Sequence, residues 1–170
     1  MRVKILKLSS GVSTPTKAHL DDLCFDCVAV SEEEVAPNVW KYGLGIALQI
    51  DRGVETMVAS TCYHGGKEKI HLTHLDFSRS PLSLSIDARP RSSVWKTGMV
   101  LSNCVGTIDE GYTGEISAVF YHVMPNMPRY KVGEKVCQIK LGMALPMDFV
   151  EVDVLEKTSR GAKGYGSSGK

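Results

Sequence analysis

Residues 103–115 place a carboxylate and an aromatic ring three positions apart in a glycine-rich segment. They read Asn-Cys-Val-Gly-Thr-Ile-Asp-Glu-Gly-Tyr-Thr-Gly-Glu, so Asp109 could orient a water molecule and Tyr112 could pack against a ligand. Asp-Glu-Gly is typical of a hairpin turn, and flanking glycines let a ligand approach the backbone closely. Taken alone, the same pattern also suits a plain surface hairpin.

Residues 90–93 (Pro-Arg-Ser-Ser) and 160–169 offer groups that suit phosphate oxygens. Arg91 precedes two hydroxyls, and the C-terminal stretch combines Arg160, Tyr165 and a pair of serines with four glycines. Arginine presents a planar fork to phosphate, and successive glycine amides can form an anion-binding nest. A tyrosine ring can stack on a base. A polar loop and an ordinary Gly/Ser tail remain open as alternatives.

The charges are divided unevenly along the chain. The 170 residues have a formal charge of +1, with 20 basic and 19 acidic side chains, which argues against a generally basic nucleic-acid binder. Residues 1–156 hold all 19 acidic and 16 of the basic residues, a charge of −3, whereas 157–170 hold four basic residues and no acid, a charge of +4. This division predicts a flexible, anion-binding arm at 157–170 on a body formed by 1–156.

Other classes of protein and site are disfavoured. No stretch approaches the roughly 20 apolar residues of a membrane helix, and the first ten residues hold too short an apolar run for a signal peptide. Five cysteines, an odd number, without a secretion signal indicate reduced thiols in a cytoplasmic protein. Cys24 and Cys27 have C-x-x-C spacing, but no second cysteine pair follows at zinc-ribbon distance, and the spacing of the cysteine and histidines of 62–74 matches no standard zinc site.

Strands must position these groups, because helix signals are weak. Apolar or alternating runs bounded by turn residues predict strands at 42–50, 82–86, 116–123, 136–141 and 149–155. Many short strands indicate one all-β sandwich or barrel domain over 1–156. The one plausible helix is a short one after residues 90–93, and residues 52–80 are expected to form a solvated β-excursion.

In chain order, five segments resemble the five motifs of the trimeric deoxyuridine triphosphatase (dUTPase) family. The counterparts of motifs one to five are residues 23–29, 90–93, 103–115, 133–138 and 160–169. The third and fifth are specific matches. The first departs, with Leu23-Cys24 where Ala-Gly is usual, and the fifth has Lys163 where a glycine is usual. Residues 52–80 look like an insertion between strands.

The resemblance implies a fold and a reaction. The fold is a jelly-roll-like, distorted β-sandwich or barrel with a mobile C-terminal arm, assembled as a homotrimer with active sites shared between subunits. The reaction is Mg²⁺-dependent hydrolysis of dUTP to dUMP and pyrophosphate by water attack at the α-phosphate, in the cytoplasm. Neither a nucleic acid nor a membrane is an expected partner.

The resemblance also implies a role for each matched residue. Asp109 bonds the 3′-hydroxyl and orients the attacking water, Tyr112 packs under the deoxyribose, and Asp26 holds Mg²⁺ through water. The hairpin that receives uracil includes Asn103, Gly106 and Ile108. The residues that contact phosphate are Arg91, Ser92, Ser93 and Gln138. The arm of another subunit closes the site with Arg160, Tyr165, Gly166, Ser167 and Ser168.

Two other functions are compatible with the fold. A deoxycytidine triphosphate deaminase shares it, but that family places a catalytic glutamate five residues after the glycine that is Gly114 here, and this chain has Val119 there. Valine cannot transfer a proton. The other alternative is a non-catalytic, dUTP-gated interaction module that binds a partner through residues 52–80.

Overall fold

The protein is built almost entirely from antiparallel β-strands. The structure, a computed structural model, describes residues 2–53, 56–64, 67–75 and 81–163. The strands are β1 (Arg2–Lys7), β2 (Phe25–Val28), β3 (Ser31–Ala36), β4 (Val39–Gly43), β5 (Ile46–Asp51), β6 (Thr56–His64), β7 (Lys67–Leu75), β8 (Ser83–Pro90), β9 (Met99–Leu101), β10 (Gly106–Asp109), β11 (Ser117–His122) and β12 (Lys135–Ala144). The described residues contain one short 3₁₀ helix, η1 (Ser92–Lys96), at the predicted place.

Two four-stranded sheets form the body. One has the order β10-β8-β12-β2 and the other β3-β4-β11-β9, while β1 pairs with β5 beside them. Apolar residues at alternate positions of β8, namely Leu84, Ile86 and Ala88, are buried in the core, as the period of two requires. An aromatic cluster fills part of the core. The rings of Tyr42, Phe120 and Tyr130 pack edge to face, with 5.4–6.2 Å between ring centroids. The predicted all-β sandwich is therefore confirmed.

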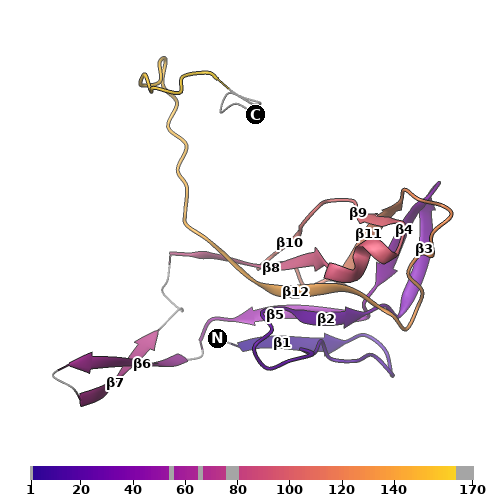
Figure 1. Cartoon of the computed structure of the whole chain (residues 1–170), viewed down its shortest axis with the longest axis horizontal. Coiled ribbons are helices and arrows are strands. Elements are labelled where there is room, and N and C mark those ends of the chain that lie inside the picture. The colour runs from indigo at the N-terminus through magenta and orange to yellow at the C-terminus, as the bar shows by residue number, and fades with distance from the viewer. Residues whose placement is uncertain (1, 54–55, 65–66, 76–80, 164–170) are drawn as a thin grey trace.

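Strands β6 and β7 and the segment after β12 both lie apart from this body. Among the described residues, strands β6 and β7 pair only with each other, as a hairpin that stands apart from the sheets in Figure 1. The two strands lie within residues 52–80, for which the sequence predicts a solvated β-excursion; that this segment is an insertion stays a prediction. After β12 the chain runs away from the sheets, and residues 145–163 are exposed. No helix in the described ranges is long and apolar enough to cross a membrane.

Two strand predictions need correction. The run 42–50 is not one strand, because Gly45 adopts a left-handed φ of 64° and separates β4 from β5. A side chain there would also meet Val12 and Val30 at 2.7 and 2.8 Å. Residues 149–155 alternate like a strand, yet they form none, because no strand of this chain pairs with them in the described structure. Alternation alone does not supply a hydrogen-bonding edge.

Candidate active site

One face of the sheet β10-β8-β12-β2 is polar and carries most of the predicted site. Leu84, Ile86 and Ala88 of β8 are buried against the core, so the alternate residues of β8 point the other way. Directly opposed residues of antiparallel strands share a face. Asp109 lies opposite Ser85 of β8 on this outer face.

The same face continues across β12 to β2. Ser85 lies opposite Gly142, and Gln138, four residues earlier on β12, lies opposite Asp26 of β2. The strand register thus places Asp109, Gln138 and Asp26 on one surface.

At the β2 corner of this face, residues from three predicted motifs surround a hollow of about 300 Å³. Arg91 donates from Nε to Asp26 Oδ1 (2.9 Å) and from Nη2 to Oδ2 (3.3 Å), and Gln138 Nε2 donates to the Pro90 carbonyl oxygen (2.9 Å). Ser92 lines the same hollow. The backbone of Asp26 is fixed by a β-bridge to Thr16.

Lys135, which the sequence did not single out, completes this group. Its Nζ lies 3.0 Å from Asp26 Oδ2, so two cations share one carboxylate. A bulge between Lys135 and Cys137 shifts the strand register by one residue. Bulges re-aim side chains in this way, and simple alternation would have placed Lys135 and Gln138 on opposite faces. The five residues Asp26, Arg91, Ser92, Lys135 and Gln138 are called the Arg91 cluster below.

The charges of the Arg91 cluster keep Asp26 ionised. Burial by itself raises the pKa of its carboxyl group, but hydrogen bonds from Arg91 and Lys135 outweigh burial and hold that pKa below its usual range. The Asp26 side chain is 12% exposed, whereas those of Arg91 and Lys135 are 30% and 42% exposed. The cluster therefore presents two cations to solvent against one shielded anion, which suits an anionic ligand.

At the opposite corner, residues 103–115, called the Asp109 hairpin, enclose a hollow of about 230 Å³ that Asp109 and Tyr112 line. The Tyr112 amide donates to the Asp109 carbonyl oxygen (3.0 Å), and the Tyr112 hydroxyl donates to that of Glu115 (3.0 Å). The Tyr112 ring lies so close to Gly114 that a Cβ there would come within 2.7 Å of Cζ. Glycine at 114 thus permits this ring position.

The carboxylate of Asp109 is held only through its backbone. Within the described part of the chain, its oxygens have no hydrogen-bond or ion-pair partner, so they are available to water or a hydroxyl. Asn103 and Gly106 also meet in this hairpin, since a Cβ at Gly106 would come within 3.2 Å of Asn103 Nδ2. Ile108 lines the same hollow as Asp109.

The two corners are far apart within one chain. Across the sheet, Asp109 and Asp26 are separated by three strand spacings of about 4.8 Å, and along the strands by four residues of about 3.3 Å each. Together these place the two residues on the order of 20 Å apart. Between them lies an ion network in which Asp87 accepts from Lys140 (3.2 Å), Ser85 (3.1 Å) and Arg89 (3.4 Å). The chain therefore presents two candidate half-sites on one face.

The predicted arm residues lie elsewhere or outside the described residues. Arg160 Nε donates to the Lys163 carbonyl oxygen (3.1 Å), and both residues belong to the segment that leaves the body. The arm of this chain does not bring Arg160 to its own Arg91 cluster. Tyr165, Gly166, Ser167 and Ser168 lie outside the described residues.

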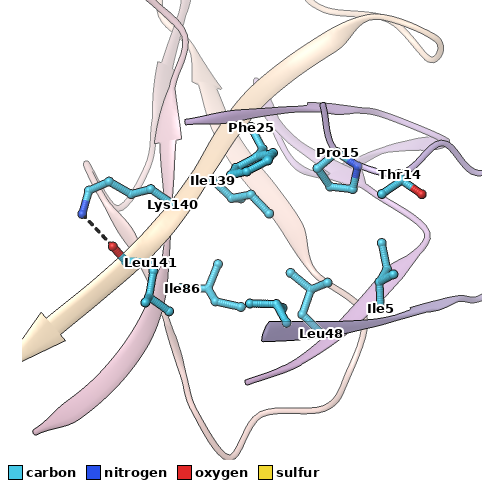
Figure 2. Close-up of a pocket in the computed structure, with 10 residues that line it drawn as sticks. Ile5, Thr14, Pro15, Phe25, Leu48, Ile86, Ile139, Lys140 and Leu141 are labelled. Atoms are coloured by element: carbon cyan, nitrogen blue, oxygen red, sulfur yellow. Dashed lines mark hydrogen bonds between the residues drawn. The ribbon is translucent and has the colours of Figure 1, made fainter. Parts of the chain in front are cut away.

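A larger hollow, about 390 Å³, lies on the apolar face of the same sheet. Figure 2 shows Ile86 and Ile139 lining it with Leu48, while Lys140 turns its ammonium to the Leu141 carbonyl oxygen at 3.2 Å. Its walls are mainly hydrocarbon, which does not suit a triphosphate. The polar hollows are therefore the better candidates despite their smaller volumes.

The metal-binding capacity of the described residues is slight. No group of three or more Cys, His, Asp or Glu side chains among them could enclose an ion. The four cysteines with described side chains, Cys24, Cys27, Cys104 and Cys137, are free thiols. Two carboxylates, those of Asp22 and Asp26, line the hollow beside Arg91. Mg²⁺ commonly keeps several waters and binds one or two carboxylates together with substrate phosphates, so this donor set fits an ion brought in by a triphosphate.

Known proteins resemble this chain in sequence and fold. The family model for dUTPase matches residues 73–169. A deoxyuridine 5′-triphosphate nucleotidohydrolase of Nocardia farcinica is 31% identical over 170 residues, covering 98% of this chain and 85% of that protein. A mutant dUTPase of Staphylococcus bacteriophage 80alpha, solved with dUpNHpp, superposes with a TM-score of 0.70 at 18% identity over 99% of each chain. A mutant dUTPase of phage phi11 of S. aureus, described with a structural Mg(II) ion, gives 0.61 at 15% identity, covering 92% of this chain and all of that one.

Proposed function

Because the chain belongs to the dUTPase family, we propose that it hydrolyses dUTP to dUMP and pyrophosphate by water attack at the α-phosphate. The family assignment supports the proposed reaction, and the jelly-roll-like sandwich is the scaffold that positions the reacting groups. The observation that supports the chemistry best is the carboxylate of Asp109, which has no side-chain partner among the described residues and lines a hollow together with Tyr112.

In this proposal the Asp109 hairpin binds the nucleoside and aligns the water. Uracil meets the backbone from Asn103 to Ile108, including Gly106, and Tyr112 packs under the deoxyribose. Asp109 bonds the 3′-hydroxyl and orients the attacking oxygen toward phosphorus. Positioning of this kind supplies much of the rate in phosphoryl transfer, where little covalent chemistry falls to the protein.

The Arg91 cluster and the arm bind the triphosphate. The Nη1 group of Arg91 donates to Ser93 Oγ over a long 3.4 Å, and Ser92, Ser93 and Gln138 add donors around it. Arg160 with Tyr165, Gly166, Ser167 and Ser168 closes over the nucleotide and excludes water. Mg²⁺, held by the triphosphate and through water by Asp26, would neutralise phosphate charge.

The separation of the two half-sites supports a homotrimer with shared active sites. Attack requires the water to lie roughly 3–3.5 Å from the reacting phosphorus, whereas Asp109 and Asp26 of one chain are on the order of 20 Å apart. One nucleotide can use both half-sites only if they come from different subunits. An arm that leaves its own body, as in Figure 1, can reach a neighbour. We also propose a cytoplasmic location.

The residue at the position of the deaminase glutamate argues against deamination. Val119 lies on β11, opposite Lys41 of β4, where the rival family requires a glutamate. The test is incubation with dUTP, dCTP, dTTP and UTP in the presence of Mg²⁺. Pyrophosphate release from dUTP alone is expected. Ammonia release from dCTP, or absence of pyrophosphate from dUTP, would contradict the proposed function.

A further inference from the structure

Arg52 joins the Asp109 hairpin to both ends of the insertion. Its Nε and Nη2 donate to Glu110 Oε1 and Oε2, each at 2.5 Å, and Nη2 also donates to the Leu82 carbonyl oxygen at 2.8 Å. The side chains of Arg52 and Glu110 are only 24% and 32% exposed. This two-pronged geometry restrains orientation as well as distance, unlike a single-contact surface pair.

The three partners come from distant parts of the sequence. Arg52 directly follows β5, and Leu82 directly precedes β8, so these residues flank the segment that carries the β6–β7 hairpin. Glu110 is the residue after Asp109, at the tip of the turn that leads to Tyr112. One guanidinium thus clamps the base of the insertion to the turn next to the proposed water-orienting carboxylate.

The Asp109 side chain depends on this turn for its position. Its own oxygens have no partner within the described residues, so backbone contacts alone aim it. On the C-terminal side of the hairpin, Glu115 Oε1 accepts from the Gly45 amide at 2.9 Å. At the tip, Glu110 is held by Arg52. A glutamate on each side of Tyr112, Glu110 and Glu115, therefore holds the hairpin to another part of the chain.

We infer that Arg52 is a positioning residue for hydrolysis. It fixes the Asp109–Tyr112 turn through Glu110 and connects that turn to the base of the β6–β7 hairpin. The inference rests on the proposed function. Loss of the clamp frees the turn tip and misplaces the oriented water more than it weakens nucleotide binding, because the uracil contacts lie earlier in the hairpin. Small displacements of a reacting group cost large factors in rate.

The test compares Arg52→Met, Glu110→Gln and the double variant with wild type. We expect kcat for dUTP to fall about tenfold in each single variant, and the double variant to fall no further than Arg52→Met, since both changes break the Arg52–Glu110 pair. KM should change less than about threefold. Arg52→Lys, which keeps the charge but not the fork, should recover part of kcat.

The chain offers a matched control in Arg129 and Glu32. This pair is also two-pronged, at 3.0 and 3.1 Å, and its side chains are 26% and 27% exposed, but it joins β3 to the segment before β12. Glu32→Gln should leave kcat unchanged. If Glu110→Gln lowers kcat no more than Glu32→Gln does, the inference is wrong.

A second readout does not depend on turnover. Hydrogen–deuterium exchange of the Tyr112 amide, which donates to Asp109, should accelerate in Arg52→Met and Glu110→Gln but not in Glu32→Gln. Unchanged exchange in the first two variants would overturn the inference even if wild type proved inactive toward dUTP. Wild-type inactivity would instead count against the proposed function.

Discussion

The Arg91 cluster and the Asp109 hairpin lie at two corners of one sheet face and differ in the surroundings of their aspartates. Asp26 is bound by Arg91 and Lys135, and its pKa is lowered by their hydrogen bonds despite burial. Asp109 has no side-chain partner within the described residues and lines an open hollow. A carboxylate that is already paired serves binding and charge balance, whereas an unpaired one is available to orient a water molecule.

The sharpest way to break this contrast is to remove the charge of Asp109. We expect Asp109→Asn to lower kcat for dUTP by about a thousandfold, within the range seen when a proton-accepting or water-orienting group is lost. Affinity for a non-hydrolysable dUTP analogue should change little. Pyrophosphate release and calorimetric binding measure the two quantities. Near-normal turnover in this variant would show that Asp109 does not orient the water.

The second test removes the arm and leaves both half-sites intact. Truncation after residue 158 deletes Arg160 and the glycine-rich segment, and we expect activity to fall about a hundredfold because bulk water is no longer excluded. The oligomer should survive, since the sheets are untouched. Sedimentation at matched concentration and a turnover assay check both parts. Full activity of the truncated protein would refute the closing-arm hypothesis.

Lys135→Met tests whether the charge balance of the Arg91 cluster serves binding. We expect KM for dUTP to rise about tenfold with kcat nearly unchanged, because a cation is lost where the triphosphate is held. Lys135→Arg should stay close to wild type. If kcat falls and KM does not, Lys135 acts on the chemical step and the division between the two corners is wrong.

The smallest expected effect concerns stability at acid pH. The pKa of Asp26 is lower in the folded protein than its usual value of about 3.9. The ionised form is therefore favoured by folding, so its stabilisation is complete above about pH 4 and is lost as the pH falls through the folded pKa.

Urea unfolding at fixed protein concentration, between about pH 5 and pH 3, measures this loss. The midpoint of wild type should fall more than that of Asp26→Asn over this interval. Asp153→Asn, at an exposed aspartate after β12, is the control and should follow wild type. An equal fall of the urea midpoint in wild type and in Asp26→Asn would contradict the pairing of Asp26 with Arg91 and Lys135.

Local sequence patterns anticipated much of the scaffold. The alternating or apolar runs at 82–86, 116–123 and 136–141 overlap β8, β11 and β12, because these strands bury one face against the core. Strands β2 and β10 were not predicted, since each spans only four residues and shows no clear period. The alternating run at 149–155 was a wrong prediction for this chain, because a strand also needs an edge to pair with.

Two residues of the candidate site were beyond sequence reasoning. Lys135 reaches Asp26 only because a bulge in β12 shifts the register by one position. Arg52 meets Glu110 across 58 positions of sequence. Neither contact has a periodic signature, because each depends on which strands become neighbours.

The amino-acid sequence by itself determined the chemical groups, the turn that carries Asp109 and Tyr112, and the family to which the chain belongs. These are local properties, since residue type and spacing decide hydrogen-bonding capacity and turn geometry. Only the tertiary structure decided that the Arg91 cluster and the Asp109 hairpin share one sheet face yet lie on the order of 20 Å apart. Strand order and register set that distance, because they are fixed by burial of the opposite face.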